Sequence, residues 1–276
     1  MSPLWRDQIQ VFFAPGRVEL VRSYRGIKPV QAPKLTAAWE RALDSPLWEQ
    51  PLRQLDQMIA DATGANMTIT ISNDFVRYAV VSPQAQIVTP AELHAYAAFH
   101  MREVYGERAG AWTLAMSAWD PCNGGVCAAI ESTLLQRLNE LAMQHRIRLK
   151  SIVPYLSSAF DQWRKGFEGE RIWFALMETG RLCLATLSNG VWRGLRNQRM
   201  LHNAGDELLA ALDQEAILFS ARKEAVEQVY LFAPEHPALT LPEDCGWRII
   251  PLQTESMSAP SHYPLAIAAP DRKTDA

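Results

Sequence analysis

A few residues of this 276-residue chain have the types and spacing that metal binding needs. Cys122 and Cys127 are spaced C-x4-C and could supply two thiolates to zinc, but a structural zinc site needs four ligands and no second pair lies nearby. We therefore expect a solvent-side turn with two free thiols, and keep a zinc-stabilised interaction domain as an alternative. His94 and His100 do not share a face of their expected helix as an i, i+4 metal pair would, so we expect them at the surface.

Patterns for acid–base and nucleophilic catalysis are weak. Glu235 and His236, beside Pro237, could form an acid–base pair, but without a partner nucleophile a loop-capping role is favoured. No G-x-S-x-G elbow occurs, so a serine hydrolase is not indicated. We expect no catalytic residues and no metal site.

Composition limits the classes of partner. Hydrophobic residues make up 48% and charged residues 21%, as in a packed globular protein. The formal charge of -3 gives no general attraction for nucleic acid or anionic lipid. No run approaches the ~18 apolar residues of a membrane span and no signal peptide is visible, so we expect a cytoplasmic protein with free thiols and no direct membrane insertion.

Apolar periodicity and turn residues predict an alternation of strands and helices. Helices are expected from Pro90, over Ile130 to His145, Ser157 to Lys165 and Ala204 to Phe219, and a broken helical pair within Leu35 to Ala62. Strands are expected at Gln8 to Phe13, Val18 to Val21, around Gly26 to Val30, Met67 to Ile71, Phe75 to Val81, Ala111 to Ser117, Arg148 to Pro154, Ile172 to Met177, Leu182 to Leu187, Val191 to Arg199, Val229 to Phe232 and Trp247 to Leu252.

The series of hairpin strands, helix, strand and helix begins again after about residue 168, which predicts a duplicated α/β plan. Single domains commonly have roughly 100 to 150 residues, so the length also favours two lobes. We expect a first lobe at 1–155, a connecting helix and linker at 156–169, and a second lobe at 170–276 that ends in a polar tail.

Tryptophan and arginine offer two further features. The stretch Val191 to Arg199 is basic and is expected to be a solvated strand face rather than an anion site. Eight tryptophans are expected to lie mostly in the core, with some as interface anchors: Trp39, Trp48, Trp112, Trp119, Trp163, Trp173, Trp192 and Trp247.

Four stretches in order along the chain resemble the PilM/GspL group, the actin-like (ribonuclease-H-like) proteins of type IV pilus and type II secretion assembly. The opening hairpin stands where that group has its first phosphate loop, and Ile71-Ser-Asn-Asp-Phe-Val-Arg-Tyr-Ala-Val80 resembles its Ser-x-x-Phe-Val-Arg-Tyr strand. Ile152-Val-Pro-Tyr155 resembles the crossover between lobes, and Trp173 to Gly180 with the following meander resembles the second phosphate loop. The resemblance implies a two-lobed actin-like fold with mixed sheets flanked by helices.

The phosphate loops depart from the pattern of nucleotide-binding actin-like proteins, which have an Asp-x-Gly turn in each lobe. The first turn reads Ala14-Pro15-Gly16, so it lacks the carboxylate and one backbone N–H donor. The second reads Glu178-Thr179-Gly180, and prolines in Ala233 to Pro237 stand where paired glycines should follow a late strand. The resemblance implies degenerate nucleotide-loop positions at Ala14, Gly16, Glu178 and Gly180, and therefore no cofactor and no enzymatic activity.

The resemblance further implies a non-catalytic cytoplasmic scaffold of an inner-membrane platform for type IV pilus or type II secretion assembly. Such a scaffold binds a short peptide of a bitopic membrane partner of the PilN type in a groove of the first lobe. It lies at the inner membrane through that partner and helps to link it to the assembly ATPase. The alternative is an active actin-like ATPase that binds ATP with magnesium and whose nucleotide state switches partner binding.

Overall fold

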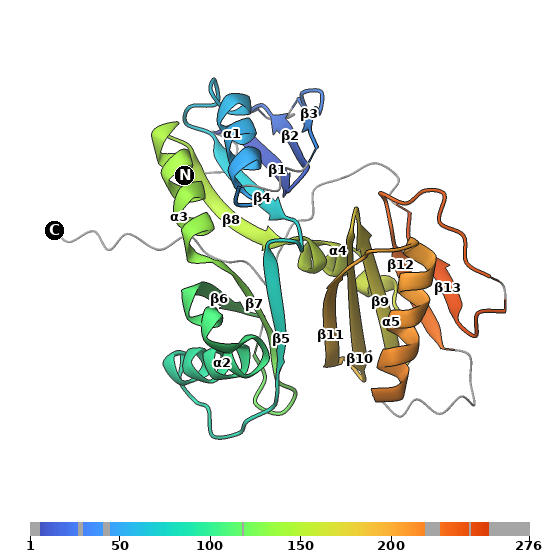
Figure 1. Ribbon diagram of the computed structural model, residues 1–276. Helices are drawn as coiled ribbons and strands as arrows, with labels where there is room; N and C mark the ends of the chain where they lie inside the picture. The colour runs from blue at the N-terminus through green and yellow to red at the C-terminus, as the bar shows by residue number, and fades with distance from the viewer. Residues whose placement is uncertain are drawn as a thin grey trace.

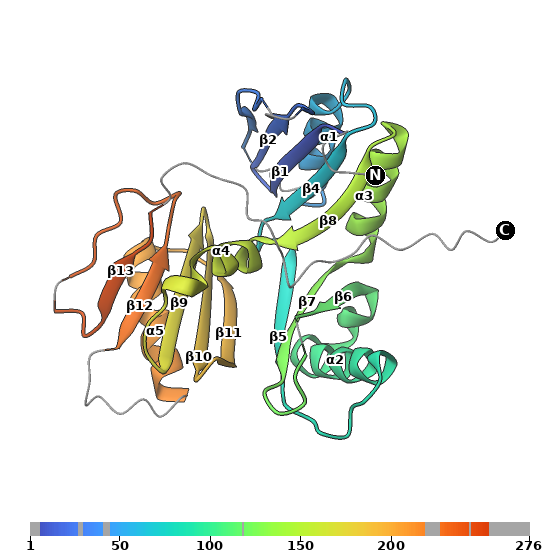
Figure 2. The ribbon, with the colours of Figure 1, turned by 180° about the vertical axis from the view of Figure 1, so that it is seen from behind.

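The computed structural model describes residues 6–26, 30–40, 45–117, 119–218, 227–242 and 244–253. These residues form two five-stranded sheets, a three-stranded sheet and flanking helices (Figure 1). Seen from behind, the short helix α4 (Tyr155–Trp163) lies between the sheets of the two lobes (Figure 2). Among the described helices, none is long and apolar enough to cross a membrane.

The sheet of the first lobe has the strand order β3-β2-β1-β4-β8. Alternation of apolar and polar residues forms β1, because Ile9, Val11 and Phe13 all point into the core. β1 pairs antiparallel with β2, and β1, β4 and β8 run parallel. The sheet packs on α1 (Glu49–Met58) and α3 (Ser132–Gln144). Its strands are β1 (Gln8–Ala14), β2 (Arg17–Ser23), β3 (Leu35–Ala38), β4 (Asn66–Ile71) and β8 (Arg148–Pro154).

The sheet of the second lobe repeats this plan in the order β11-β10-β9-β12-β13. The first three strands form an antiparallel meander and the last two run parallel to β9, as in the first lobe. Helix α5 (Ala204–Leu218) packs on β10. The duplicated plan inferred from the sequence is therefore present. Its strands are β9 (Arg171–Glu178), β10 (Arg181–Ser188), β11 (Val191–Arg199), β12 (Gln228–Phe232) and β13 (Arg248–Pro251).

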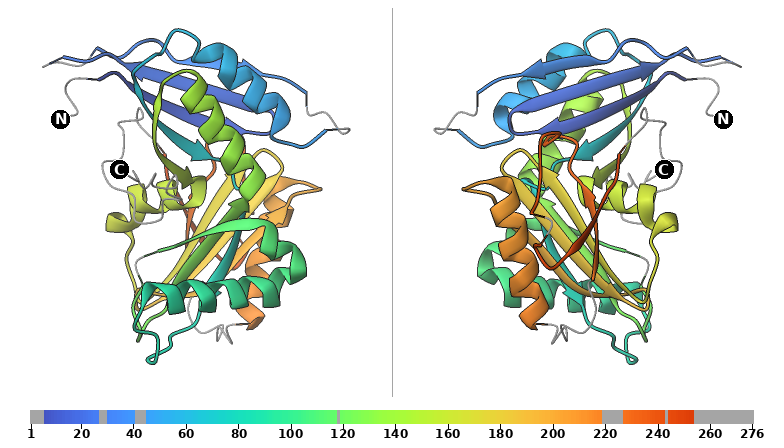
Figure 3. Two further views of the ribbon diagram at one scale, coloured as in Figure 1. Left: turned by 90° about the vertical axis from the view of Figure 1, so that its left-hand side faces the viewer. Right: turned by 90° about the vertical axis from the view of Figure 1, so that its right-hand side faces the viewer.

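A small antiparallel sheet of order β5-β7-β6 belongs to the N-terminal part of the chain but stands apart from the first sheet. The side views in Figure 3 show the first-lobe sheet at one end of the molecule and the small sheet with α2 (Pro90–Tyr105) at the other. Its strand β5 contacts β11 of the second lobe, so this sheet helps to join the lobes. Its strands are β5 (Val76–Val81), β6 (Trp112–Met116) and β7 (Gly125–Glu131).

Two local expectations were wrong. Within 35–62, the described residues, 35–40 and 45–62, hold strand β3 and one helix, α1, instead of two helices. Strand β7 was missed, since its run of small residues was interpreted as a turn followed by a helix. The expected strands β4 and β5 are both present and belong to different sheets, because the chain crosses between the two sheets at residues 72–75. The expected strand around Gly26 to Val30 and the polar tail from residue 256 fall largely or wholly outside the described residues.

Candidate functional site

At the turn between β9 and β10, the acidic side chain of Glu178 points into the protein. Gly180 has a φ of 74°, a left-handed conformation that favours glycine. The Glu178 side chain before it is almost fully buried, and its Oε1 accepts hydrogen bonds from the Asn73 backbone N–H at 3.0 Å and from Asn73 Nδ2 at 2.6 Å. The Glu178 carboxylate therefore binds residues 72–75, the segment that crosses between two sheets, instead of facing an open cleft.

Asn73 is the centre of a wider network between the lobes. Its Oδ1 accepts a hydrogen bond from the Tyr78 hydroxyl at 2.5 Å and from the Leu156 backbone N–H at 3.3 Å. Its carbonyl oxygen accepts from Asn197 Nδ2 of β11 at 2.9 Å. Asn73 thus receives hydrogen bonds from β5, α4 and the second lobe at once, which fixes the position of the crossing segment.

A buried ion pair lies beside this network. Arg181, the first residue of β10, places its Nη2 2.7 Å from Asp74 Oδ1, and the two side chains are 8% and 7% exposed. Since each charge lies in a low-dielectric region and depends on the other for compensation, this pair strongly couples the two parts of the chain.

The turn between β1 and β2 offers no acidic group. Ala14 and Gly16 flank the buried Pro15, which has no N–H to donate. The carbonyl oxygen of Gly16 accepts a hydrogen bond from the Trp39 backbone N–H at 3.1 Å. In this turn the side chain that reaches the second lobe is the following arginine, Arg17.

The loop after β12 contacts both turns through Glu235. Glu235 Oε1 pairs with Arg17 Nη2 at 2.6 Å, while Oε2 accepts hydrogen bonds from the Thr179 backbone N–H at 2.7 Å and from Thr179 Oγ1 at 2.6 Å. His236 Nε2 donates to the Glu178 carbonyl oxygen at 3.2 Å. The backbone donor of the second turn and the cation of the first turn are therefore both satisfied by one carboxylate of the chain itself.

Burial sets the protonation of Glu178. Removal from water raises the pKa of this carboxyl to about 7, opposed by hydrogen bonds from Ser72 and Asn73, and the charge of Glu235 raises it further. Glu178 consequently changes its charge near neutral pH while lying in contact with the first lobe.

Aromatic side chains pack between the lobes next to these polar groups. Tyr155 of α4 packs edge-on against Phe12 of β1 at a centroid distance of 4.9 Å and against Phe232 of β12 at 6.2 Å. The Arg17 guanidinium lies 4.9 Å from the centre of the Phe12 ring. The lobes are thus joined by packed side chains below the polar closure.

The four positions expected from the degenerate motifs lie in the two turns, and Glu235 connects the turns. For Glu235 a loop-capping role was favoured over an acid–base pair with His236, and Arg17, Asn73, Asp74 and Arg181 were not expected to form a site. One signal was readable: both turns have the dipeptide Gly-Arg, at Gly16 and at Gly180. The acidic partners could not be found, because Glu235 lies 218 positions from Arg17 in the sequence.

The cysteine and histidine expectations have mixed outcomes. Cys122 is exposed, but Cys127 is buried in β7, so the expected solvent-side turn with two thiols was wrong for Cys127. Burial raises the pKa of Cys127 to about 12, which disfavours the thiolate that zinc requires. His94 is exposed, and His100 is half-buried near Glu103. Across the described ranges, no group of three or more His, Cys, Asp or Glu side chains could hold a metal ion.

The tryptophan and β11 expectations also need correction. Of the eight tryptophans only Trp173 is fully buried, and the other seven are half-buried against the cores. Strand β11 is not simply a solvated basic face: Arg196 pairs with Glu215 at 2.7 Å, and Asn197 bonds the crossing segment. The reason is that β11 contacts β5, so one part of its surface is covered.

Two cavities lie outside the closed junction. One, of about 370 Å³, lies between the start of α1, the small sheet, α3 and the end of β11, and Trp48, Arg77, Trp112, Glu131 and Arg199 are among its lining residues. The other, of about 150 Å³, lies between α4, the small sheet and β11.

No family model matches the chain, and no curated protein matches its sequence. Solved structures do match. A PilM-PilN type IV pilus biogenesis complex is similar over 89% of this chain and 88% of the matched chain, with a TM-score of 0.62 and 13% sequence identity. The cytoplasmic domain of EpsL, an inner membrane component of the type II secretion system of Vibrio cholerae, is similar over 90% of each chain, with a TM-score of 0.56 and 9% identity.

A protein of unknown function from Bacteroides thetaiotaomicron, with an actin-like ATPase fold, is similar over 83% of this chain and 81% of its own, with a TM-score of 0.56 and 8% identity. At these identities the likeness concerns the fold. It agrees with the repeated strand order of the two lobes. The chain therefore has the two-lobed actin-like fold that the order of its motifs predicted, and in this fold it is similar to the PilM-PilN and EpsL structures.

Proposed function

We propose that this protein is a non-catalytic scaffold of a type IV pilus or type II secretion-like assembly platform at the inner membrane. The observation that carries this proposal is the closure of the junction by Glu235. This carboxylate takes the Thr179 N–H and the Arg17 guanidinium, the groups of the two turns that could otherwise receive an anion.

The charges and hydrogen-bond donors of the two turns also argue against ATP binding. A nucleotide phosphate would have to displace Glu235 and would then lie near Glu178 without the carboxylate-bound metal that usually offsets phosphate charge. The first turn supplies neither an acid for the metal nor, at Pro15, a backbone donor. Binding of ATP is therefore opposed on both sides of the junction.

For partner binding, the larger cavity is the best candidate groove. It combines two tryptophans, Trp48 and Trp112, with Arg77 and Arg199, the residue types that most often anchor protein interfaces. The about 370 Å³ volume is in the range of roughly 300 to 1,000 Å³ usual for ligand sites. A protein of similar fold forms a complex with PilN. The proposed ligand is a short cytoplasmic peptide of a bitopic membrane protein of the PilN type.

This proposal places the protein in the cytoplasm, at the inner membrane through its partner and in contact with the assembly ATPase complex. Recognition of the peptide involves no chemical step. The two lobes act as one rigid body, because the junction is held by hydrogen bonds and ion pairs of the chain itself.

Peptide binding can be tested with a fluorescently labelled synthetic peptide that carries the cytoplasmic N-terminus of the PilN-type protein of the same organism. We expect saturable binding by fluorescence anisotropy, weakened at least about tenfold by Trp112→Ala, as is usual for an aromatic anchor. Trp247→Ala, a half-buried tryptophan of the second lobe, is the matched control and should bind normally. Absence of binding, or equal losses in the two variants, would contradict the proposed groove.

A further inference from the structure

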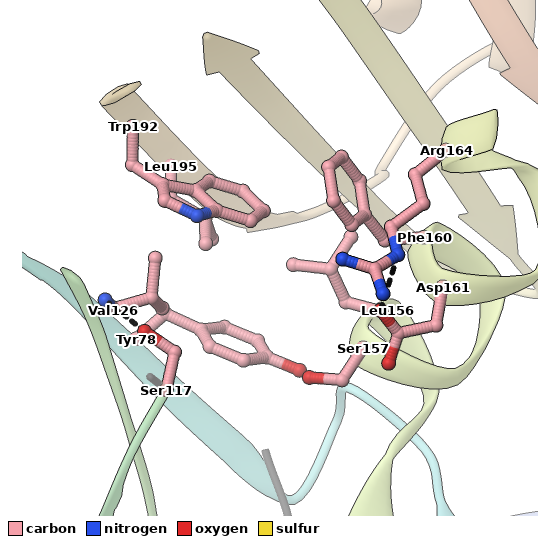
Figure 4. Close-up of a pocket in the computed structure, with 10 residues that line it drawn as sticks. All are labelled: Tyr78, Ser117, Val126, Leu156, Ser157, Phe160, Asp161, Arg164, Trp192 and Leu195. Atoms are coloured by element: carbon pink, nitrogen blue, oxygen red, sulfur yellow. Dashed lines mark hydrogen bonds and ion pairs between the residues drawn. The ribbon is translucent and has the colours of Figure 1, made fainter. Parts of the chain in front are cut away.

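The two cavities differ in whether their charged side chains are already paired. In the smaller cavity, shown in Figure 4, Oδ1 of Asp161 lies 3.3 Å from Nε of Arg164. In the larger cavity, Arg77 and Arg199 form no ion pair with any residue that the structure describes. The larger cavity therefore offers two cations without a carboxylate partner.

The two acidic side chains of the larger cavity are bound to other groups. Asp74 Oδ1 lies 2.7 Å from Nη2 of the buried Arg181. Oε2 of Glu131, an exposed residue, accepts a hydrogen bond from Nε1 of Trp48 at 3.3 Å. Since neither carboxylate forms an ion pair with the two cations, a carboxylate from outside the chain would find both guanidinium groups available.

Arg77 is held in place with one edge of its guanidinium group free. Its Nη1 donates hydrogen bonds to the carbonyl oxygens of Asp74 at 3.0 Å and of Val76 at 2.8 Å. Its Nε and Nη2 have no hydrogen-bond partner among the described residues and remain accessible to solvent. These two atoms form an edge that can bind a carboxylate side-on. Arg22 uses the same edge in this chain, since its Nε and Nη2 both donate to Asp7 Oδ2.

The surroundings of Arg77 disfavour its positive charge. Burial lowers the pKa of this half-buried guanidinium, and the charge of Arg181 lowers it further, against the opposing effects of Tyr105 and Asp74. By comparison, the half-buried Arg196 of β11 has a glutamate carboxylate at 2.7 Å. A negative charge beside Arg77 would therefore offset a cost that the chain itself does not offset with an ion pair.

The strand register places the second arginine on the same side of the sheet. Arg199 of β11 and Arg181 of β10 are direct partners, so their side chains leave the sheet on one face. On that face Arg181 reaches the crossing segment. Asn197, two residues before Arg199, points the same way and donates to the Val76 carbonyl oxygen at 2.9 Å. Arg199 is exposed and lines the same cavity as Arg77, so the two cations flank one space.

We propose that the larger cavity receives an acidic side chain of the partner peptide, an aspartate or a glutamate whose carboxylate binds the free edge of Arg77 beside Arg199. The inference rests on the proposed function, because it assigns a charge to the peptide that the scaffold binds. A carboxylate is favoured over a phosphate group, since the charges of Asp74 and Glu131 in the same cavity repel a dianion more strongly than a single charge.

A probe that does not depend on the partner tests the charge site. Nα-acetyl-glutamate N-methylamide is titrated into the full chain labelled with ¹⁵N-tryptophan. The Trp112 indole resonance, assigned by its loss in Trp112→Phe, should shift and saturate in the millimolar range. The neutral glutamine analogue should bind at least about tenfold more weakly, because it lacks the charge-assisted hydrogen bonds. Absence of a shift, equal binding of the two analogues, or tighter binding of inorganic phosphate would each overturn the proposal.

Arg77→Gln and Arg199→Gln should each weaken the glutamate probe by a similar factor. Arg193→Gln removes the same charge from another exposed position of β11, outside both cavities, and is the matched control that should bind normally. Thermal melts verify folding, and the exposed Arg199 decides the test if Arg77→Gln does not fold. Unchanged binding in a folded Arg199→Gln variant, or an equal loss in Arg193→Gln, would contradict the site.

The labelled PilN-type peptide separates this inference from the proposed function. Replacing its acidic residues one at a time by their amides should reveal one position at which affinity falls about tenfold in the wild type but not in Arg77→Gln. A peptide that binds through Trp112 and keeps its affinity after every replacement would exclude the acidic anchor and leave the scaffold proposal intact. A glutamate probe that binds while the peptide does not would exclude the PilN-type partner and retain the carboxylate site.

Discussion

The β1–β2 turn and the β9–β10 turn occupy corresponding places in the two lobes, and in each a Gly-Arg pair sends an arginine across to an acid beyond its own lobe. Arg181 reaches Asp74 inside the protein, where both side chains are less than a tenth exposed. Arg17 reaches Glu235 near the surface, with a side chain 31% exposed. The same Gly-Arg sequence therefore forms a buried ion pair at the β9–β10 turn and a partly exposed ion pair at the β1–β2 turn.

The two turns also differ in whether they have an acidic residue. The second turn keeps Glu178, which lies buried against Asn73, while the first turn has Ala14 at the matching position. Surroundings rather than residue type decide what these groups do: a carboxylate that bonds the neighbouring lobe is no longer available to a metal ion. In a scaffold of the proposed kind, loss of nucleotide binding and a fixed lobe arrangement would share one structural cause.

Breaking the buried ion pair of Asp74 and Arg181 should have the largest effect on stability. Asp74→Ala leaves the Arg181 charge buried without a partner and should lower the free energy of unfolding by about 3–5 kcal/mol. Urea denaturation followed by circular dichroism measures this loss. The double variant Asp74→Ala with Arg181→Met removes both charges and should regain most of it. A loss below about 1 kcal/mol for Asp74→Ala, the size typical of exposed pairs, would show that the pair is not buried.

The second expected effect is a pH dependence from Glu178. Its pKa is raised from 4.5 to about 7 in the folded state, so between these values the folded protein holds the proton and the unfolded chain does not. Stability from this group is complete below pH 4.5 and is lost as the pH rises through 7, by at most about 1.4 kcal/mol per pH unit.

Denaturation curves of the wild type and of Glu178→Gln between pH 5 and pH 8 test this dependence. Glutamine can still accept from Asn73 but does not ionise, so the wild type should lose stability relative to the variant as the pH rises. Parallel curves would mean that Glu178 ionises with an ordinary pKa.

The partly exposed pair of Arg17 and Glu235 should give the smallest effect. Arg17→Met removes a solvent-screened pair and should lower the free energy of unfolding by about 1 kcal/mol or less. Glu235→Gln and the double variant complete a cycle whose coupling energy should be equally small and should decrease in 1 M salt. A coupling energy as large as that between Asp74 and Arg181 would erase the difference between the two turns.

Local signals predicted much of the fold. The alternation of Ile9, Val11 and Phe13 fixes the inner face of β1, and the Ser-Asn-Gly turn before Val191 ends β10 where expected. β7 was missed because Ala128 and Ala129 have weak strand propensity, and only pairing with β5 and β6 on both sides makes them a strand.

The candidate site was predictable only in part. The turns that hold Glu178 and Gly180 could be placed, since they lie in short hairpins with local signals. The groups that close the junction come from distant parts of the chain: Asp74 lies 107 positions from Arg181. Such pairs arise from the packing of the lobes, which no local pattern of residues encodes.

The absence of nucleotide binding is the central claim, and isothermal titration calorimetry of magnesium-ATP into the purified full chain tests it most directly. We predict no heat of binding at millimolar nucleotide, because Glu235 and Glu178 occupy the groups that phosphate and metal would need. Saturable binding in the micromolar range would contradict the scaffold proposal and would favour an actin-like ATPase whose nucleotide state controls its partners.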